Sequence, residues 1–405
     1  MRTYPLGLVP GPSQVPRDLV LEAYGTPFGS ADLELEFLEL YKQTQALLRE
    51  LLRATAQHEV VIQSGEGMLA LWSALKSCVK PGDKVLAVAN GVYGYGFADM
   101  ARQIGAQVEV VGFEYDEATT DYERIREAAL RFRPSLITAV HCETPSGILN
   151  PVGPIGKIAR EVDALFYVDV VSSFCGADVR VAEWGIDLAL VGSQKCLGLL
   201  PNLSIVCVSP RAWPIIQQVN YVGYDALLPW RMETIAPSSS SSSATEEEAK
   251  KAEENEGEFL FPYTCDWHSI SALHDRCNNI LHGDGLDAHL HRHETVAQYT
   301  RHRLRQLGLQ LWLLEEEPEP EHEQEREHHF APTVTAVKVP EGWTWRQLDK
   351  ELRLHGVVFG GSYGPLAGNV FRVGHMGLQA DMQLVREALD ALELVLQDKK
   401  HGAAG

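Results

Sequence analysis

Two residues with useful chemistry stand near the ends of two apolar runs. Asp169 lies near the end of the run LFYVDV (165–170), and Lys195 follows the run LALVGS (188–193) by two residues. A lysine whose pKa is lowered by partial burial can form a Schiff base with an aldehyde. An aspartate opposite the nitrogen of a pyridine ring keeps that nitrogen protonated, so that the ring accepts electrons. The spacing alone equally allows an ordinary salt bridge or two unrelated surface residues.

These two runs belong to a series of short apolar segments that predict strands buried on both faces. The predicted strands are residues 60–65, 84–90, 107–113, 136–143, 165–170, 188–193 and 204–209. Helix-like stretches separate them, among them residues 66–78, 95–104 and 122–132. This alternation predicts an α/β fold with a mostly parallel seven-stranded sheet. Ligands on such sheets bind at the carboxyl ends of the strands, where Asp169 and Lys195 are expected.

The C-terminal third predicts a smaller α+β domain. A strand is expected at TVTAVKV (333–339), a helix at 345–356, further strand-like segments at VVFGGSYG and FRVGHMG, and a last helix at 380–398. We therefore expect three parts. Residues 1–30 would pack on the active site and the small domain, residues 31–290 would form the large domain, and residues 291–405 the small one.

Two acidic segments interrupt this pattern. Residues 236–258 contain six consecutive serines and then a Glu-rich run, and residues 315–329 are rich in Glu and His. Such segments have too little apolar surface to offset their ordering entropy, so we expect surface loops. The histidine spacing in the second segment matches no metal-ligand motif, and no metal site is predicted.

The composition excludes several classes of protein. The 405 residues carry a formal net charge of −20, a poor match to nucleic acid or an anionic membrane. The apolar runs are too short for a membrane span, and the Pro- and Gly-rich start is no signal peptide. The seven cysteines are scattered without a CxxC pair, which favours a reducing compartment, and we expect a cytoplasmic protein.

A set of motifs in a fixed order carries a resemblance to a known family. The motifs are SGEGMLAL, NGVYGYG, ETPSGILNP, VDVVSS, GSQKCLG, FPYT and FRVGHMG. Together they resemble the class V, fold-type I aminotransferases, the group with the alanine–glyoxylate and serine–pyruvate enzymes. The resemblance runs from about residue 11 to 395. It implies a vitamin B6 cofactor, a homodimer, and a small amino donor and 2-oxo acid as substrates.

The resemblance implies roles for residues around the cofactor ring. Lys195 would form the Schiff base and move the proton, and Gln194 would contact the phosphate side. Asp169 would pair with the ring nitrogen, and Val171 would pack behind the ring. Tyr93 would stack on its face. The alternative, a core aromatic, is disfavoured because Tyr93 stands among glycines after a predicted strand.

Other positions are expected to contact the substrate, the ring oxygen or a second subunit. The Thr144 hydroxyl would reach the ring oxygen, unless it only serves the turn before Pro145. Arg372 would bind the substrate carboxylate with its planar fork, close to Gly11. Thr264 would be contributed to the active site of the other subunit.

The loop SGEG (64–67) departs from most relatives, in which the loop and helix N-terminus hold the 5′-phosphate through backbone N–H groups. Ser64 and Gly65 fit that role, but the carboxylate of Glu66 would repel a phosphate. The alternative is that Glu66 turns outward as a first-turn helix residue. Pyridoxamine–pyruvate aminotransferases, which resemble this chain, have a glutamate here and take the unphosphorylated vitamer as substrate. Those enzymes have an additional arginine where Tyr363 stands, and the segment 360–368 is more similar to alanine–glyoxylate enzymes.

The sequence thus predicts an aminotransferase that moves an amino group to pyruvate or glyoxylate through Lys195. One candidate is the pyridoxamine–pyruvate branch, which forms pyridoxal and L-alanine. The other is an alanine–glyoxylate or serine–pyruvate enzyme that uses pyridoxal 5′-phosphate. A lyase or desulfurase on the same fold would need a mobile cysteine, for which Cys265 is the nearest candidate. A catalytically silent binding protein is the remaining alternative.

Overall fold

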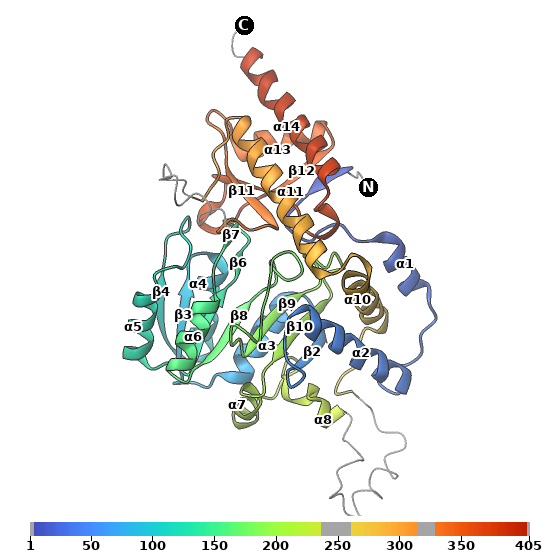
Figure 1. Cartoon of the computed structure of the whole chain (residues 1–405), viewed down its shortest axis with the longest axis vertical. Coiled ribbons are helices and arrows are strands. Elements are labelled where there is room, and N and C mark those ends of the chain that lie inside the picture. The colour runs from blue at the N-terminus through green and yellow to red at the C-terminus, as the bar shows by residue number, and fades with distance from the viewer. Residues whose placement is uncertain (1–3, 236–260, 314–328, 403–405) are drawn as a thin grey trace, which may run out of the picture.

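The computed structural model describes residues 4–235, 261–313 and 329–402. It contains a seven-stranded and a four-stranded sheet, each covered by its own helices, and a two-stranded hairpin. The long helix α11 (Leu286–Gln306) runs from the lower to the upper part in Figure 1. The acidic segments 236–258 and 315–329 lie outside the described residues, apart from His329. Their expected loop character stays a prediction.

The large sheet contains the seven expected strands. They are β2 (Glu59–Ser64), β3 (Lys84–Ala89), β4 (Gln107–Gly112), β5 (Leu136–Val140), β8 (Leu165–Asp169), β9 (Leu188–Gly192) and β10 (Leu203–Val208). Their order is β2-β10-β9-β8-β5-β3-β4, and only β10 runs antiparallel to its neighbours. The predicted α/β fold with a mostly parallel sheet is confirmed.

The expected strand 136–143 is wrong in one respect, because the chain leaves the large sheet at His141. The N–H of Asn150 donates to the His141 carbonyl at 2.7 Å, which starts a hairpin outside the sheet. Strand β6 (Cys142–Glu143) then pairs with β7 (Ile148–Leu149). This hairpin places the segment that contains Thr144 beside the carboxyl ends of the sheet.

Helices cover the large sheet on both faces, as Figure 1 shows. They are α1 (Arg17–Gly25), α2 (Leu35–Leu51), α3 (Gly67–Cys78), α4 (Val92–Ile104), α5 (Tyr122–Phe132), α6 (Gly153–Glu161), α7 (Ala212–Val219), α8 (Met232–Ile235) and α10 (Trp267–Asn279), with the single turns η1 (Leu228–Trp230) and η2 (Ile280–Asp284). Helix α5 has the expected bounds because the Asp121 side chain accepts the N–H of Arg124 at its start. Its buried residues, Ile125, Ala128 and Ala129, lie on one face at helical spacing.

The second sheet combines the two ends of the chain. Its order is β1 (Leu6–Leu8), β12 (Val357–Gly361), β13 (Val370–Gly374) and β11 (Val334–Lys338). Helices α11 (Leu286–Gln306), α13 (Trp345–Leu354) and α14 (Met382–Gly402), with the turns η3 (Gly364–Leu366) and η4 (Gly377–Gln379), complete this part. It has a hydrophobic core separate from that of the large sheet. No helix of the described residues has the length and apolar character of a membrane span.

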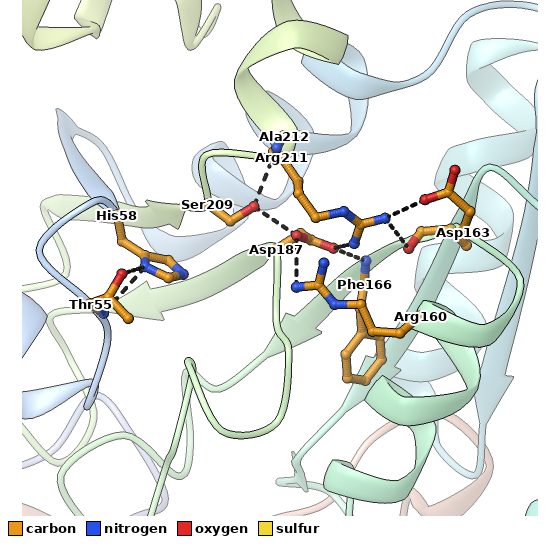
Figure 2. Close-up of polar contacts among 10 residues, drawn as sticks. Thr55, His58, Arg160, Asp163, Phe166, Asp187, Ser209, Arg211 and Ala212 are labelled. Carbon is orange, nitrogen blue, oxygen red and sulfur yellow. Dashed lines mark hydrogen bonds and ion pairs between the residues drawn. The ribbon is translucent and has the colours of Figure 1, made fainter.

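The amino ends of β8 and β9 and the carboxyl end of the antiparallel β10 meet at the buried carboxylate of Asp187, just before β9 (Figure 2). It accepts hydrogen bonds from the Phe166 N–H at 3.0 Å, the Ser209 hydroxyl at 2.7 Å and the Arg211 guanidinium at 2.9 Å. The Arg160 guanidinium lies 3.5 Å away. Asp187 thus ties β8, β10 and the helices behind them together at the edge opposite the predicted site.

Candidate active site

A hollow lies at the carboxyl ends of β8 and β9, where ligands bind on parallel sheets. Its lining residues are Glu66, Gly67, Met68, Leu71, Tyr93, Asp169, Val171, Ser172, Leu190, Gln194 and Lys195. The hollow therefore brings together six residues that the sequence singled out: Glu66, Tyr93, Asp169, Val171, Gln194 and Lys195.

Asp169 is the last residue of β8 and is 7% exposed. One of its carboxylate oxygens accepts the N–H of Val171 at 2.8 Å. Burial raises the pKa of Asp169 to about 6, against smaller opposing contributions from that hydrogen bond and from Lys195. A buried carboxylate with a single backbone donor suits a cationic hydrogen-bond partner, and the protonated nitrogen of a pyridine ring would be one.

Lys195 lies on the turn that follows β9. Its ammonium group donates to the Pro10 carbonyl at 2.6 Å, and the Ser13 hydroxyl donates to the Lys195 carbonyl at 2.5 Å. A Cβ atom on Gly11 would lie only 2.8 Å from the Lys195 nitrogen, so only glycine fits there without a shift. Burial, followed by the charge of Arg372, lowers the pKa of Lys195 to about 8. A fraction of neutral amine, the form that attacks a carbonyl, is therefore present near neutral pH.

Glu66 is the N-cap residue of α3. One carboxylate oxygen accepts the Met68 N–H at 3.0 Å, and the other accepts the Gln194 side-chain N–H at 2.6 Å. Glu66 therefore caps the helix, as a residue favoured by the macrodipole would, and also faces Gln194 across the hollow. Ser64 and Gly65 precede it but are not among the lining residues. The Ser64 hydroxyl instead accepts the Asp266 N–H at 3.3 Å.

Tyr93 lies in the first turn of α4, and a buried glutamate fixes that turn. The Glu143 carboxylate accepts the N–H of Gly94 at 2.7 Å and that of Tyr93 at 3.3 Å. Burial raises the pKa of Glu143 to about 8 despite these two hydrogen bonds. Sequence reasoning missed Glu143. The available signal was an acidic residue in an otherwise apolar run, directly before Thr144.

Arg372 enters the site from β13 of the second sheet and is 6% exposed. Its guanidinium donates to the carbonyls of Gly361, at 3.1 Å from Nε, and Thr144, at 3.4 Å from Nη1. Within the described residues no carboxylate forms an ion pair with it. The Thr144 hydroxyl is hydrogen-bonded to the hydroxyl of Ser172, which lines the hollow. A buried guanidinium without an ion pair to a described carboxylate can bind a substrate carboxylate.

Thr264 does not line the hollow of its own chain. Its hydroxyl donates to Asp32 at 3.4 Å, next to the start of α10. The expectation that it serves a second subunit stays a prediction.

The described residues fit a vitamin B6 ring. Asp169 would face the ring nitrogen. Tyr93 and Val171 line the same hollow and would contact the two faces of the ring. Lys195 also lines the hollow and would bind the aldehyde. The Gln194 side-chain oxygen is buried without a hydrogen-bond partner, so a donor on a bound molecule would complete it. The site thus combines the buried acid Asp169, the lysine Lys195 with its lowered pKa, and the Arg372 guanidinium, which has no ion pair to a described carboxylate. This combination suits proton transfer on a bound amino acid.

Comparisons with known proteins agree with this chemistry. The family described as aminotransferase class-V matches residues 17–224. Pyridoxamine–pyruvate transaminase from Mesorhizobium japonicum is 29% identical over 364 residues, which cover 89% of this chain and 84% of that protein.

Solved structures match over nearly the whole chain. Pyridoxamine–pyruvate aminotransferase from Mesorhizobium loti has a TM-score of 0.84 at 26% identity, covering 98% of this chain and 93% of that one. Alanine–glyoxylate aminotransferase from Nostoc sp. has a TM-score of 0.82 at 29% identity, covering 98% and 96%. The chain belongs to the class V aminotransferases and is an enzyme of this vitamin B6-dependent family.

Proposed function

We propose that this enzyme transfers an amino group from pyridoxamine to a small 2-oxo acid, with pyruvate giving L-alanine and pyridoxal. The observation that carries the proposal is the position of the Glu66 carboxylate. It accepts the Met68 N–H at 3.0 Å and the Gln194 side-chain N–H at 2.6 Å. These are donors that a cofactor phosphate at the start of α3 would need.

The charge of Glu66 strengthens this argument. A carboxylate beside a phosphate dianion is repulsive, and the repulsion grows as water is excluded from the hollow. An uncharged hydroxymethyl group, as in pyridoxamine, can instead donate a hydrogen bond to the carboxylate. Glu66 therefore favours the vitamer without its phosphate. The Mesorhizobium relatives are named for pyridoxamine, which is such a vitamer.

The other residues would divide the chemistry among themselves. When bound, pyridoxamine would supply the amino group that passes to the carbonyl of the 2-oxo acid, and its ring would supply an electron-accepting π-system. Asp169 holds a proton on the ring nitrogen, and Tyr93 restrains the tilt of the ring. Lys195, with a pKa of about 8, accepts and returns the proton at the substrate carbon. Arg372 holds the carboxylate of the 2-oxo acid.

An alanine–glyoxylate enzyme that uses pyridoxal 5′-phosphate is the second candidate. It is favoured by the exposure of Glu66, whose side chain has room to turn outward. A desulfurase is disfavoured because all seven cysteines are buried. Burial also raises the pKa of Cys265 to about 12, so its thiol is protonated at neutral pH.

The deciding experiment is an absorbance titration of cofactor-free protein with pyridoxal and, separately, with pyridoxal 5′-phosphate. We expect pyridoxal to bind the more tightly of the two. In Glu66→Ala the preference should shift toward the phosphate ester by at least about tenfold, because a charge repulsion is removed. Asp121→Ala is the matched control, since it removes an N-cap carboxylate from α5 far from the hollow. Tighter binding of the phosphate ester by the wild-type protein would contradict the proposal and favour the second candidate.

A second subunit that places its Thr264 near this site belongs to the same proposal. Size measurement of the holoenzyme by light scattering tests it, with a monomer as the contradicting result.

A further inference from the structure

The segment Ser362–Gly364 lies between β12 and β13 and contacts residues of the large-sheet part beside the hollow. The Ser362 hydroxyl donates to the Pro145 carbonyl at 3.0 Å. A Cβ atom on Gly364 would lie 2.9 Å from the Val92 side chain, so this glycine packs closely on the start of α4. Tyr363 stands between these two contacts and is therefore held at a fixed position next to the site.

Tyr363 contacts two residues of the proposed machinery at once. Its hydroxyl lies 2.5 Å from the Tyr93 hydroxyl, and the two rings meet edge to face with centroids 6.2 Å apart. The Arg372 guanidinium lies over the Tyr363 ring, 5.0 Å from its centroid. The side chain thus links the aromatic residue of the hollow to the cation expected to bind a carboxylate.

The hydroxyls of Tyr93 and Tyr363 together have one proton that their mutual hydrogen bond does not use. Burial raises the pKa of both phenols, so both keep their protons at neutral pH. Two neutral hydroxyls have two protons, but the bond between Tyr93 and Tyr363 uses only one of them. The other O–H can donate to an anion that binds beside Arg372, and such a charge-assisted bond is among the stronger ones.

The surrounding charges limit which anion fits. The described residues that line the hollow include the carboxylates Glu66 and Asp169. The nearby cations are Arg372 and Lys195, and Lys195 is needed for proton transfer. A second carboxylate on the substrate would therefore meet acids rather than a free cation. The site suits a monocarboxylate.

We propose that Tyr363 is a substrate-binding residue, whose hydroxyl binds the carboxylate of a small 2-oxo acid together with Arg372. This inference rests on the proposed function and adds a residue that recognises this carboxylate. The hydroxyl supplies affinity for the carboxylate, and the acidic lining of the hollow disfavours a second one.

The test is a single-turnover absorbance measurement on protein loaded with the aminated vitamer that it binds, mixed with pyruvate, 2-oxobutyrate or 2-oxoglutarate. Tyr363→Phe should raise the half-saturating pyruvate concentration about tenfold, with little change in maximal rate, because one bond to a charged group is lost. Tyr363→Ala should raise this concentration at least as much, because it removes the same hydroxyl. Wild-type protein should discriminate strongly against 2-oxoglutarate.

Tyr95→Phe is the matched control, on the helix α4 that also carries Tyr93. The Tyr95 hydroxyl donates to the Phe113 carbonyl at 3.2 Å, outside the hollow, so its loss should leave all three substrates unaffected. An unchanged half-saturating pyruvate concentration in Tyr363→Phe would overturn the inference. The choice between phosphorylated and free vitamer in the loading step tests the proposed function separately.

Discussion

Asp169 and Asp187 are two buried aspartates of the large sheet. Asp169 is the last residue of β8 and Asp187 directly precedes the neighbouring β9, so the two lie at opposite ends of adjacent parallel strands. Strands β8 and β9 pair in parallel, with Asp169 opposite Leu190 and Asp187 just before the first residue of β9. Asp187 is completely buried and has three hydrogen-bond donors, with a second guanidinium beside them (Figure 2). Asp169 has one backbone donor and faces a hollow.

The difference shows that burial alone does not distinguish a catalytic acid from a structural one. Both carboxylates have lost water, and each needs compensation. At Asp187 the protein supplies it completely, from strand, helix and loop. At Asp169 the compensation is incomplete, and burial therefore raises the pKa to about 6. An incompletely bonded buried acid beside a hollow is the one expected to receive its partner from a ligand.

The largest expected effect comes from Asp169→Asn. The amide no longer favours a protonated ring nitrogen, so turnover should fall by about a hundredfold or more. Thermal stability should not fall, because a buried charge has been removed. Steady-state transamination and thermal unfolding of the same preparation measure the two quantities. A variant that keeps its turnover would place Asp169 in the same structural class as Asp187.

The opposite result is expected for Asp187→Asn. Removing this charge leaves Arg160 without its ion-pair partner and Arg211 with only the exposed Asp163, which should lower the free energy of unfolding by roughly 2–4 kcal/mol. We expect the lower part of that range because both arginine side chains reach solvent. Turnover per folded molecule should be kept.

Urea unfolding measures the loss of stability in Asp187→Asn. Asp99→Asn is the control, since it breaks the exposed Asp99–Arg102 pair and should change stability little. Equal effects of the two substitutions would mean that the Asp187 cluster is no stronger than a surface pair.

The sequence identified Asp169 as a candidate functional residue but gave no indication of the role of Asp187, for a physical reason. Asp169 stood out because it lies near the end of an apolar run, close in sequence to a lysine that follows the next run. The partners of Asp187 lie on three other segments, and no local pattern joins them. The seven strands could be predicted because burial on both faces makes each of them continuously apolar.

The site could be predicted only where a side chain belongs to a motif. Glu143 was missed because its role depends on two N–H groups of α4, about fifty residues away in the chain. The contact of Tyr363 with Tyr93 joins two sheets and could not be read from either motif. Glu66 was recognised as a departure, but its bond to Gln194 needed the structure.

The pH dependence of stability sharpens the comparison further. The pKa of Asp169 is about 6 in the folded protein, against 3.8 for an ordinary aspartate, so the folded state binds the proton more tightly between these values. The stability contributed by this proton is complete below about pH 4 and is lost as the pH rises through 6, on the order of 2 kcal/mol. Urea unfolding of cofactor-free wild-type protein between pH 4 and 7.5 should show this fall.

Asp169→Asn should lack that fall, and saturating pyridoxal should abolish it in the wild type because a protonated ring nitrogen favours the carboxylate. An identical slope in the variant would assign the titration to another group, of which Glu143 is the nearest alternative with a raised pKa.

The smallest expected effect is that of Ser209→Ala. The Ser209 hydroxyl donates to the Asp187 carboxylate at 2.7 Å and accepts the Ala212 N–H at 3.3 Å, so one bond to a charged group and one neutral bond are lost. Asp187 keeps its bonds to Phe166 and Arg211, and the loss should be about 1.5 kcal/mol with no change in turnover. In the Asp187→Asn background the same substitution should cost less, because the two residues share one bond. A loss in Ser209→Ala as large as that in Asp187→Asn would mean that the hydroxyl, rather than the guanidinium groups, supplies most of the compensation for the buried charge.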